Sequence, residues 1–324
     1  MIIPDDEIDR LLRAVNPATA SADELSVQAI AVRESIIRGT YAPARQRRGW
    51  AWGRFAVAVA AIVAIVIVAT NVLAPAQRAT ALTPPPLQYD NAQPLATVVQ
   101  EAKERLGSTV SVVQERRVSS LVWGWSIDLA KERVESVPQR VTFEWAPETG
   151  SRSSIIAGES HWPAGVRPEG IEESPYQPGD TITQLVTAPQ DLKIPADVMN
   201  LNDGSRESMD KALTSLGATE SSSSGEVLVV IGRLLSYWTL TNEQHNILID
   251  RLVEAGGVTV LGESTDRLGR DVIGLRVADP ATTYQDTVLI SRDTGRIVGM
   301  ENELTAAQDF IPAGVIGYTL WDAN

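Results

Sequence analysis

Few residues of this chain could carry out acid–base or metal chemistry. His161 and His245 are the two histidines among 324 residues, and cysteine is absent. Without thiolates a zinc or iron–sulfur site loses its commonest ligands, and neither histidine belongs to a His-Glu-x-x-His pattern. The chain also lacks the Gly-x-Ser-x-Gly nucleophile elbow and the two glycine-rich phosphate-binding patterns. We therefore expect a protein that is not an enzyme and that holds no metal and no cofactor.

Tryptophan is the residue type that most suggests a binding site. The chain has eight Trp against six Tyr and three Phe. Trp123 and Trp125 stand two apart in a strand-like segment, so both rings are expected on one face of a sheet. Such a face can line a groove for an acyl chain or a short peptide. It can equally pack against the domain's own helices, as buried aromatic residues usually do.

One stretch has the length and composition of a membrane span. Residues 55–74 read FAVAVAAIVAIVIVATNVLA, in which Asn71 is the one strongly polar residue. About 20 apolar residues, at a rise of about 1.5 Å each, cross a bilayer core of about 30 Å. A buried helix of a soluble domain is seldom this long without a polar face. The sequence therefore predicts one transmembrane helix at 55–74, with the lipid bilayer as a partner.

The flanks of this span predict its orientation. Arginines crowd its amino side, whereas Arg78 alone follows it closely, so we expect a cytoplasmic amino terminus and an extracytoplasmic carboxyl domain. A cleaved signal peptide is the alternative, because Ala79-Thr80-Ala81 resembles a cleavage site. Its leading region of 54 residues would, however, be long and partly acidic. The expected membrane-interface residues are Arg47, Arg48, Trp50, Trp52 and Arg54.

Residues 1–54 are expected to form a short cytoplasmic helical segment. Its apolar residues recur at helical spacing in two stretches, the second of which opens with Ser21 and Glu24 at capping-box spacing. Two short helices bury too little surface to fold stably alone, so they need a partner or remain a weakly ordered tether. The candidate partner-binding residues are Ile8, Leu11, Leu12, Val15, Leu25, Ala29, Val32 and Ile36.

Charge is distributed unevenly along the chain. Residues 1–54 contain eight Arg and seven Asp or Glu, whereas residues 79–324 contain 19 Lys or Arg and 34 Asp or Glu. Nucleic-acid binding depends on neutralising phosphates with Lys and Arg. We therefore expect no nucleic-acid partner.

The part that follows the span divides into a proline-rich linker at 75–93 and a domain at 94–324. In the linker, Thr83-Pro84-Pro85-Pro86 favours extended polyproline geometry, as in a stiff spacer that holds a domain off the bilayer. The domain begins with a helix whose first turn contains Pro94. Strand-like segments, then helical ones, then strands again indicate an α+β fold in which an antiparallel sheet is packed with helices.

Particular elements of the domain can be placed by local signals. The segments 109–118, 121–130 and 139–147 read as strands, and Glu226–Trp238 as a buried helix. Thr241 with Gln244 caps a further helix. Turns are expected at Asp266–Arg270 and at Asp293-Thr294-Gly295. Prolines at 163, 168, 175 and 178 predict a long loop or flap over 160–180, which could close a groove at Trp123 and Trp125.

The layout resembles a family of actinobacterial single-pass membrane proteins described as membrane-anchored, anti-sigma-like regulators. The likeness rests on Asp-x-x-x-Arg-Leu-Leu-Arg-Ala-x-Asn-Pro at residues 6–17, on the arginine-flanked span, and on GVTVLGESTDRLGRDVIGLRV near the end. The zinc-type anti-sigma domain carries a His-x-x-x-Cys-x-x-Cys motif, which residues 1–54 lack. The outer domain is also similar in layout to the half-barrels of lipoprotein carriers and periplasmic sigma regulators.

Two functions follow from these expectations. The first is an envelope-sensing regulator of anti-sigma type without a zinc motif, whose inner helices hold a sigma factor. The alternative is a membrane-anchored extracytoplasmic domain that binds or carries lipid or peptide and has no signalling role.

Overall fold

The computed structural model describes residues 83–124, 135–162, 167, 171–278, 284–307 and 313–322. Within these ranges, nine strands form one antiparallel sheet in the order β4-β3-β2-β1-β9-β8-β7-β6-β5. Every neighbouring pair in this order is antiparallel. The strands are β1 (Arg117–Gly124), β2 (Gln139–Ala146), β3 (Gly150–Ala157), β4 (Thr181–Thr187), β5 (Thr259–Thr265), β6 (Asp271–Val277), β7 (Tyr284–Ser291), β8 (Ile297–Leu304) and β9 (Gly314–Trp321).

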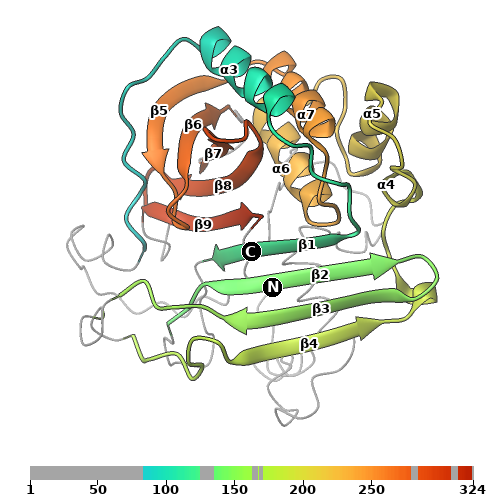
Figure 1. Cartoon of the computed structure of the whole chain (residues 1–324). Coiled ribbons are helices and arrows are strands. Elements are labelled where there is room, and N and C mark those ends of the chain that lie inside the picture. The colour runs from blue at the N-terminus through green and yellow to red at the C-terminus, as the bar shows by residue number, and fades with distance from the viewer. Residues whose placement is uncertain are drawn as a thin grey trace, which may run out of the picture. The chain divides into compact units, whose positions relative to one another are not determined.

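Helices precede and divide the strands, and this confirms the expected α+β class for the domain. Figure 1 shows β5–β9 curving around α6, with α3 and α7 above them, while β1–β4 continue the sheet to one side. The helices are α3 (Leu95–Ser108), α4 (Ala196–Met199), α5 (Arg206–Ser215), α6 (Ser224–Leu235) and α7 (Asn242–Glu254), with a short 3-10 turn at Pro189–Asp191.

The last strand joins the two halves of the sheet. β9 pairs with β1 through Ser120↔Trp321 on one side and with β8 through Gly299↔Leu320 on the other. A strand from the end of the chain therefore lies between the first strand and the carboxyl-terminal hairpins. The order of the nine strands follows from this insertion.

The main core lies between the sheet and the helices. Leu228, Ile231 and Leu234 of α6 and Leu248 of α7 are fully buried there, together with alternate residues of the strands. We call the side of the sheet that carries this core the helix-side face and the opposite side the outer face. A second, smaller apolar cluster covers the outer face.

Both central helices begin with a capping box, of which the sequence predicted the second. Ser223 and Glu226 form a complete capping box at the start of α6, as Thr241 and Gln244 do at the start of α7. In the turn before β6, the Asp266 carboxylate accepts hydrogen bonds from the backbone N–H groups of Leu268 and Arg270, at 2.9 and 3.0 Å. These observations confirm the expected cap of the 241–254 helix and the turn at Asp266–Arg270.

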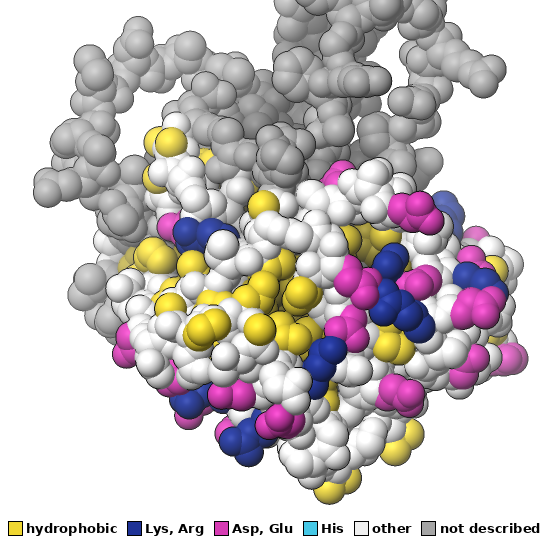
Figure 2. Space-filling view, turned by 90° about the horizontal axis from the view of Figure 1, so that it is seen from above, with side chains coloured by type: hydrophobic (Ala, Val, Ile, Leu, Met, Phe, Trp, Pro, Cys, Tyr) yellow, Lys and Arg dark blue, Asp and Glu magenta, His cyan; other side chains and the backbone are white. Residues whose placement is uncertain are grey.

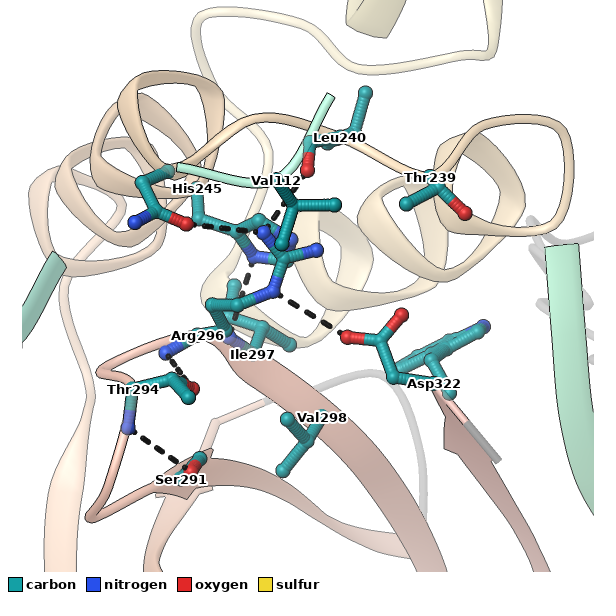
Figure 3. Close-up of polar contacts among 12 residues, drawn as sticks. Val112, Thr239, Leu240, His245, Ser291, Thr294, Arg296, Ile297, Val298 and Asp322 are labelled. Atoms are coloured by element: carbon teal, nitrogen blue, oxygen red, sulfur yellow. Dashed lines mark hydrogen bonds and ion pairs between the residues drawn. The ribbon is translucent and has the colours of Figure 1, made fainter. Parts of the chain in front are cut away.

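A buried arginine joins the β8 end of the core to the helices (Figure 3). The Arg296 guanidinium donates hydrogen bonds to the Leu240 carbonyl at 2.9 Å and to Asn242 Oδ1 at 3.1 Å, and its Nε lies 3.3 Å from Asp322 Oδ2. The next residue, Ile297, donates its N–H to His245 Nδ1 at 3.2 Å. Burial and the nearby Arg296 charge lower the pKa of His245 well below its usual value, so the imidazole is neutral. This histidine therefore has a structural role.

The proline-rich segment before α3 contacts the sheet over residues 83–91, a contact that the sequence did not predict. We call these residues the strap; Figure 1 shows it running from α3 past β5 toward the start of β9. Asp90 and Glu263 exchange backbone hydrogen bonds of 3.0 and 2.7 Å. The Tyr89 ring occupies the space that a side chain at Gly274 would fill, since a Cβ there would stand 2.3 Å from its Cε1 atom. Burial of Leu87 and Tyr89 against the outer face favours docking over extension into solvent.

Two strand expectations need correction. The segment expected as a strand at 109–118 enters the sheet only at Arg117. Residues 110–114 lie outside the sheet, and the described contacts of the Glu115 backbone form an isolated bridge with Thr239. Strand β4 lies in the segment after the prolines, where no strand was expected. Its alternation of apolar and polar residues is interrupted at Leu185-Val186, which hid it from a search for period-two patterns.

Several expectations fall on residues outside the described ranges. These include the span at 55–74, the interface residues Arg47 to Arg54 and the partner-binding residues between Ile8 and Ile36. Among the helices that the structure describes, none combines the length and apolar character needed to cross a bilayer.

Candidate functional site

A cleft of about 670 Å³ opens at the end of the sheet where β1 begins and β2 ends. Volumes of this order are typical of small-molecule sites. The lining comes from four separate parts of the chain, which are the approach to β1, the end of β2, the loop after α4 and the loop after α6. The lining residues are Gln114, Glu115, Arg116, Arg117, Glu144, Trp145, Leu201, Asn202 and Trp238.

Two tryptophans form the floor of this cleft. The Trp145 and Trp238 rings meet edge to face, with centroids 5.1 Å apart, and are 2% and 4% exposed. Each indole N–H is satisfied by a backbone carbonyl, Trp145 Nε1 donating to Tyr237 at 2.7 Å and Trp238 Nε1 to Val198 at 2.8 Å. The floor is therefore held in one orientation by both packing and hydrogen bonds.

Arg116 lies over both rings. Its guanidinium carbon is 5.0 Å from the Trp145 ring centroid and 5.5 Å from that of Trp238, which is cation–π distance. The Arg116 carbonyl accepts a hydrogen bond from Trp145 N at 3.0 Å, which fixes the backbone at this point. Among the described residues, neither Arg116 nor its neighbour Arg117 has an acidic side chain within ion-pair distance. Two cations thus face the cleft without a carboxylate partner from the described chain.

The segment that leads along the chain to the cleft contains three valines. The chain reaches Gln114 through Val110, Val112 and Val113, and the outermost of these, Val110 and Val113, are 93% and 73% exposed. Gln114 itself is fixed, because its amide donates to the Leu201 carbonyl at 2.5 Å and its oxygen accepts from Gln244 at 3.1 Å. Exposed apolar side chains therefore precede the lining residues Gln114 to Arg117 in the chain.

A second hollow of about 630 Å³ lies beside α5 and has a different character. Its two lining cations are already paired, since Arg206 contacts Glu254 and Lys211 contacts Glu207 at 2.7 Å. In the view from above in Figure 2, charged side chains of both signs crowd one side of the molecular surface, next to a hydrophobic area. With its cations engaged, this hollow is the weaker candidate for binding an anion.

The structure places Trp123 on the outer face, away from the cleft. Its ring stacks on Tyr318 at 5.9 Å, meets His161 edge to face at 5.3 Å, and is 3% exposed. The indole N–H donates to the Ser136 carbonyl at 2.6 Å. The helices expected to share a groove with this ring cover the opposite face, because Trp123 lies an odd number of residues from the core residue Val118. Trp125 lies outside the described residues.

Ionisable groups are buried beside Trp123. Arg267 Nε donates to Glu301 Oε1 at 2.7 Å, its guanidinium carbon lies 4.9 Å from the Tyr318 ring centroid, and it also donates to the strap carbonyl of Pro85 at 3.0 Å. The Tyr318 hydroxyl is 3.1 Å from His161 Nε2. Burial, and secondarily the Arg267 charge, lower the pKa of His161 to about 4. Burial raises the pKa of Glu301, although Arg267 opposes that effect.

The start of the expected flap is fixed over this cluster. Arg167 Nε donates to Glu135 Oε2 at 2.8 Å, and Ser160 donates to the other oxygen of the same buried carboxylate. His161 follows Ser160 and is thereby brought to Trp123. Ser160 and His161, at the start of the 160–180 segment, therefore lie on the outer face.

No group of three or more His, Asp or Glu side chains suitable for a metal ion occurs among the residues that the structure describes. His161 and His245 lie in different clusters, one on the outer face and one in the helix-side core. His161 contacts Trp123 and Tyr318, and His245 accepts a hydrogen bond from the Ile297 N–H.

Sequence reasoning missed the cleft residues Arg116, Trp145 and Trp238. The signal for Trp145 was present, because the aromatic residues Phe143 and Trp145 flank the charged Glu144 near the end of β2. No local signal indicated that these residues would contact one another, since residues 116, 145 and 238 are far apart in the sequence and meet only in the folded chain.

The comparisons with known proteins give distant structural likeness. The sequence matches no known protein family, and no curated protein is detectably similar to it. A LolA superfamily protein from Nitrosomonas europaea is 11% identical, covers 71% of this chain and 92% of its own, and has a TM-score of 0.18. An outer membrane lipoprotein-sorting domain from Vibrio parahaemolyticus is 11% identical, covers 70% of this chain and 89% of its own, and has a TM-score of 0.19. A DUF1329 family protein from Desulfovibrio piger is 12% identical, covers 71% of this chain and 92% of its own, and has a TM-score of 0.19.

Two of these names agree with the expected likeness to lipoprotein carriers. None of the three names an anti-sigma protein or comes with an actinobacterial source, so that part of the expected resemblance has no support in them. At TM-scores this low, the likeness carries no argument about what the chain binds. The candidate site therefore rests on the geometry of the cleft alone.

Proposed function

We propose that the outer domain is a binding domain, and not an enzyme, that holds an amphipathic ligand with an anionic group in the cleft at Arg116. The observation that carries this proposal is the position of the Arg116 guanidinium, which lies over Trp145 and Trp238 and has no acidic partner among the described residues. Of the two functions expected from the sequence, this proposal agrees with the second, a membrane-anchored extracytoplasmic domain that binds or carries lipid or peptide.

Arginine in this setting is suited to a carboxylate or phosphate. Its planar guanidinium presents N–H donors in a fork that matches two oxygens of such a group. Stacking on the two indole rings holds the plane in place, so less side-chain entropy is lost when an anion binds. Arg117, the next lining residue, is a second cation in a lining that also holds the carboxylates of Glu115 and Glu144.

The apolar part of the ligand is expected along the exposed valines that precede the cleft residues in the chain. Val110 and Val113 are among the most exposed large apolar side chains of the described residues. An aliphatic chain or an apolar peptide side chain laid along them would be removed from water while the anion remains at Arg116. At about 25 cal/mol per Å² of apolar area, such contact adds affinity beyond that of the ion pair.

The remaining features of the proposal rest on the sequence. The span at 55–74 would anchor the domain at a membrane, and the strap would join the anchor to the end of the sheet near Gly314, where Thr83 lies. The cleft is at the other end of β1. In an anchored chain it would thus stand away from the point where the chain enters the domain. The anti-sigma function depends on residues 1–54, and no described contact favours it.

Binding of a short anionic amphiphile to the full-length chain in lipid nanodiscs tests the proposal. Octyl phosphate is the probe, intrinsic tryptophan fluorescence the readout, and octanol the uncharged comparison. Arg116→Gln should weaken octyl phosphate binding by roughly tenfold or more, because a charge-assisted bidentate contact contributes about 1.5–3 kcal/mol. Arg116→Lys should recover only part of the loss, since an ammonium lacks the planar fork.

The matched control is Arg152→Gln, an exposed arginine on β3 that does not line the cleft. Its affinity for octyl phosphate should equal that of the wild type. Because the probe partitions into the lipid of both samples equally, this control also corrects for that partition. Equal binding by wild type and Arg116→Gln would show that the cleft is not the anion site.

A further inference from the structure

The two edges of the sheet are finished differently. At the β5 edge, the strap pairs with the outermost strand through the two backbone hydrogen bonds between Asp90 and Glu263. At the other edge, β4 pairs with β3 and, among the described residues, with no other strand. β4 therefore presents a row of backbone N–H and C=O groups to a further strand.

β4 also lacks two of the usual protections of an exposed edge strand, charge and proline. Its sequence, TITQLVT, contains no Lys, no other charged residue and no Pro. Val186 is 69% exposed on the outer face. Natural edges are commonly blunted by charge, proline or a bulge, and here a bulge at Ile182 breaks the register with β3. The regular edge thus runs from Thr183 to Thr187.

These five residues are nearly symmetric in sequence about their centre. Reversing Thr-Gln-Leu-Val-Thr about Leu185 places Thr183 opposite Thr187, Gln184 opposite Val186, and Leu185 opposite itself. Facing residues of an antiparallel pair share a face of the sheet, so Leu185 would meet Leu185 on the helix-side face. No facing pair brings like charges together.

We propose that the β4 edge is a self-association surface, on which a second copy of this chain adds its own β4 antiparallel and centred on Leu185. Such a contact is isologous and closes after two copies, because the same strand serves both partners about a two-fold axis. It would extend the sheet across both copies, bury Val186 beside Gln184 of the partner copy, and satisfy the free backbone groups.

A second copy fits this edge better than an unrelated extended peptide. A peptide would have to supply a complementary sequence, whereas the symmetry about Leu185 supplies it from the chain itself. The contact is short, and interfaces below about 1,000 Å² are typically weak, so association is expected to be reversible and dependent on concentration.

The absence of native cysteine makes the pairing directly testable in the full-length chain. In an antiparallel pair, facing Cα atoms stand about 4.5–5.5 Å apart, within the range that a disulfide bridges. Leu185→Cys should therefore give a covalent dimer on mild oxidation. Thr181→Cys is the control on the same exposed strand, because its two copies would lie about 27 Å apart along the ladder. We expect at least a roughly tenfold higher dimer yield for Leu185→Cys, as the distances predict.

A charge exchange on the outer face tests the register. Gln184→Glu with Val186→Glu would place carboxylates opposite each other in both halves of the ladder and should abolish the dimer. Gln184→Lys with Val186→Glu would place an ammonium opposite each carboxylate and should restore it. Both positions are exposed, so neither pair of substitutions should impair folding, which thermal unfolding of each variant would check.

The readout for these variants is sedimentation velocity of the full-length chain over a range of concentrations. Cross-linking of Leu185→Cys no greater than that of Thr181→Cys would overturn the proposal. A dimer that persists in the doubly acidic variant would also overturn it and would place self-association elsewhere on the chain.

Discussion

The helix-side face of the sheet and the outer face are built from alternate residues of the same strands, yet they are closed by different means. On the helix-side face, α6 and α7 contribute fully buried aliphatic residues such as Leu228 and Leu248. On the outer face, the strap and the 158–162 loop cover Trp123 and Tyr318 together with the ion pair Arg267–Glu301.

This difference teaches how each face depends on its cover. An aliphatic core gains stability in proportion to the area buried and needs no particular partner for each atom. A buried ion pair repays its desolvation only while both charges and their hydrogen bonds are in place. We therefore expect the helix-side face to determine overall stability and the outer face to respond to single polar substitutions, strap displacement and pH.

The largest effect is expected in the helix-side core. Leu228→Ala removes a fully buried side chain from α6 and should lower the free energy of unfolding by about 2–5 kcal/mol, because the cavity can collapse only in part. Urea unfolding of the full-length chain measures this. Leu87→Ala in the partly buried strap is the control and should cost less than half as much; equal losses would show that the strap belongs to the same cooperative core.

The next effect concerns the buried ion pair of the outer face. Arg267→Met leaves Glu301 buried without its cation and should lower the free energy of unfolding by about 3 kcal/mol. Adding Glu301→Leu should recover most of that loss, since the unpaired charge is then gone. The control is Arg206→Met, which breaks the exposed pair with Glu254 and should cost less than about 1 kcal/mol. A double variant no more stable than Arg267→Met alone would contradict this account.

Strap docking should respond to one added methyl group. Gly274→Ala would bring a Cβ to 2.3 Å from Tyr89 Cε1, so the ring and the strap must move. We expect faster amide hydrogen exchange in residues 86–91 and a stability loss of about 1–2 kcal/mol, as for other overpacked sites. Gly107→Ala is the control, because a Cβ there has no neighbour within 4 Å. Unchanged exchange in the strap would show that Tyr89 does not hold it down.

The last expected effect is a pH dependence of stability that comes from His161. Its pKa of about 4 in the folded protein lies below the usual value of 6.5, so the unfolded chain binds more protons between these values. This group therefore lowers stability as the pH falls from about 6.5 to about 4. Protonation would also remove the acceptor available to the Tyr318 hydroxyl. His161→Gln should show a shallower decline of the unfolding midpoint over that interval.

Other groups also titrate in this pH range. Subtracting the His161→Gln curve from the wild-type curve removes their contribution and leaves that of His161. Burial raises the pKa of Glu301, which opposes the histidine, and the lowered pKa of His245 acts in the same direction as His161. A difference curve that is flat between pH 4 and 6.5 would refute the assignment.

Features encoded in neighbouring residues were predictable from the sequence. The capping box at Thr241 and Gln244 and the turn at Asp293–Gly295 depend on residues within one turn of each other, and both are present. The buried helix within Glu226–Trp238 was recognisable because apolar residues continue for longer than a strand normally does. The α+β class follows from the order of such local elements.

Features that need distant residues to meet were decided by tertiary structure alone. Nothing within β9 indicates that it lies between β1 and β8, and the proline-rich strap gave no local signal that Tyr89 would dock against Gly274. The cleft gathers Arg116, Trp145 and Trp238, whose contact depends on the packing of the sheet against the loop after α6. Local preferences act within a few residues, whereas burial and charge pairing reward contacts at any separation. The sequence by itself therefore determined the elements, and only the tertiary structure determined which of their side chains form a site.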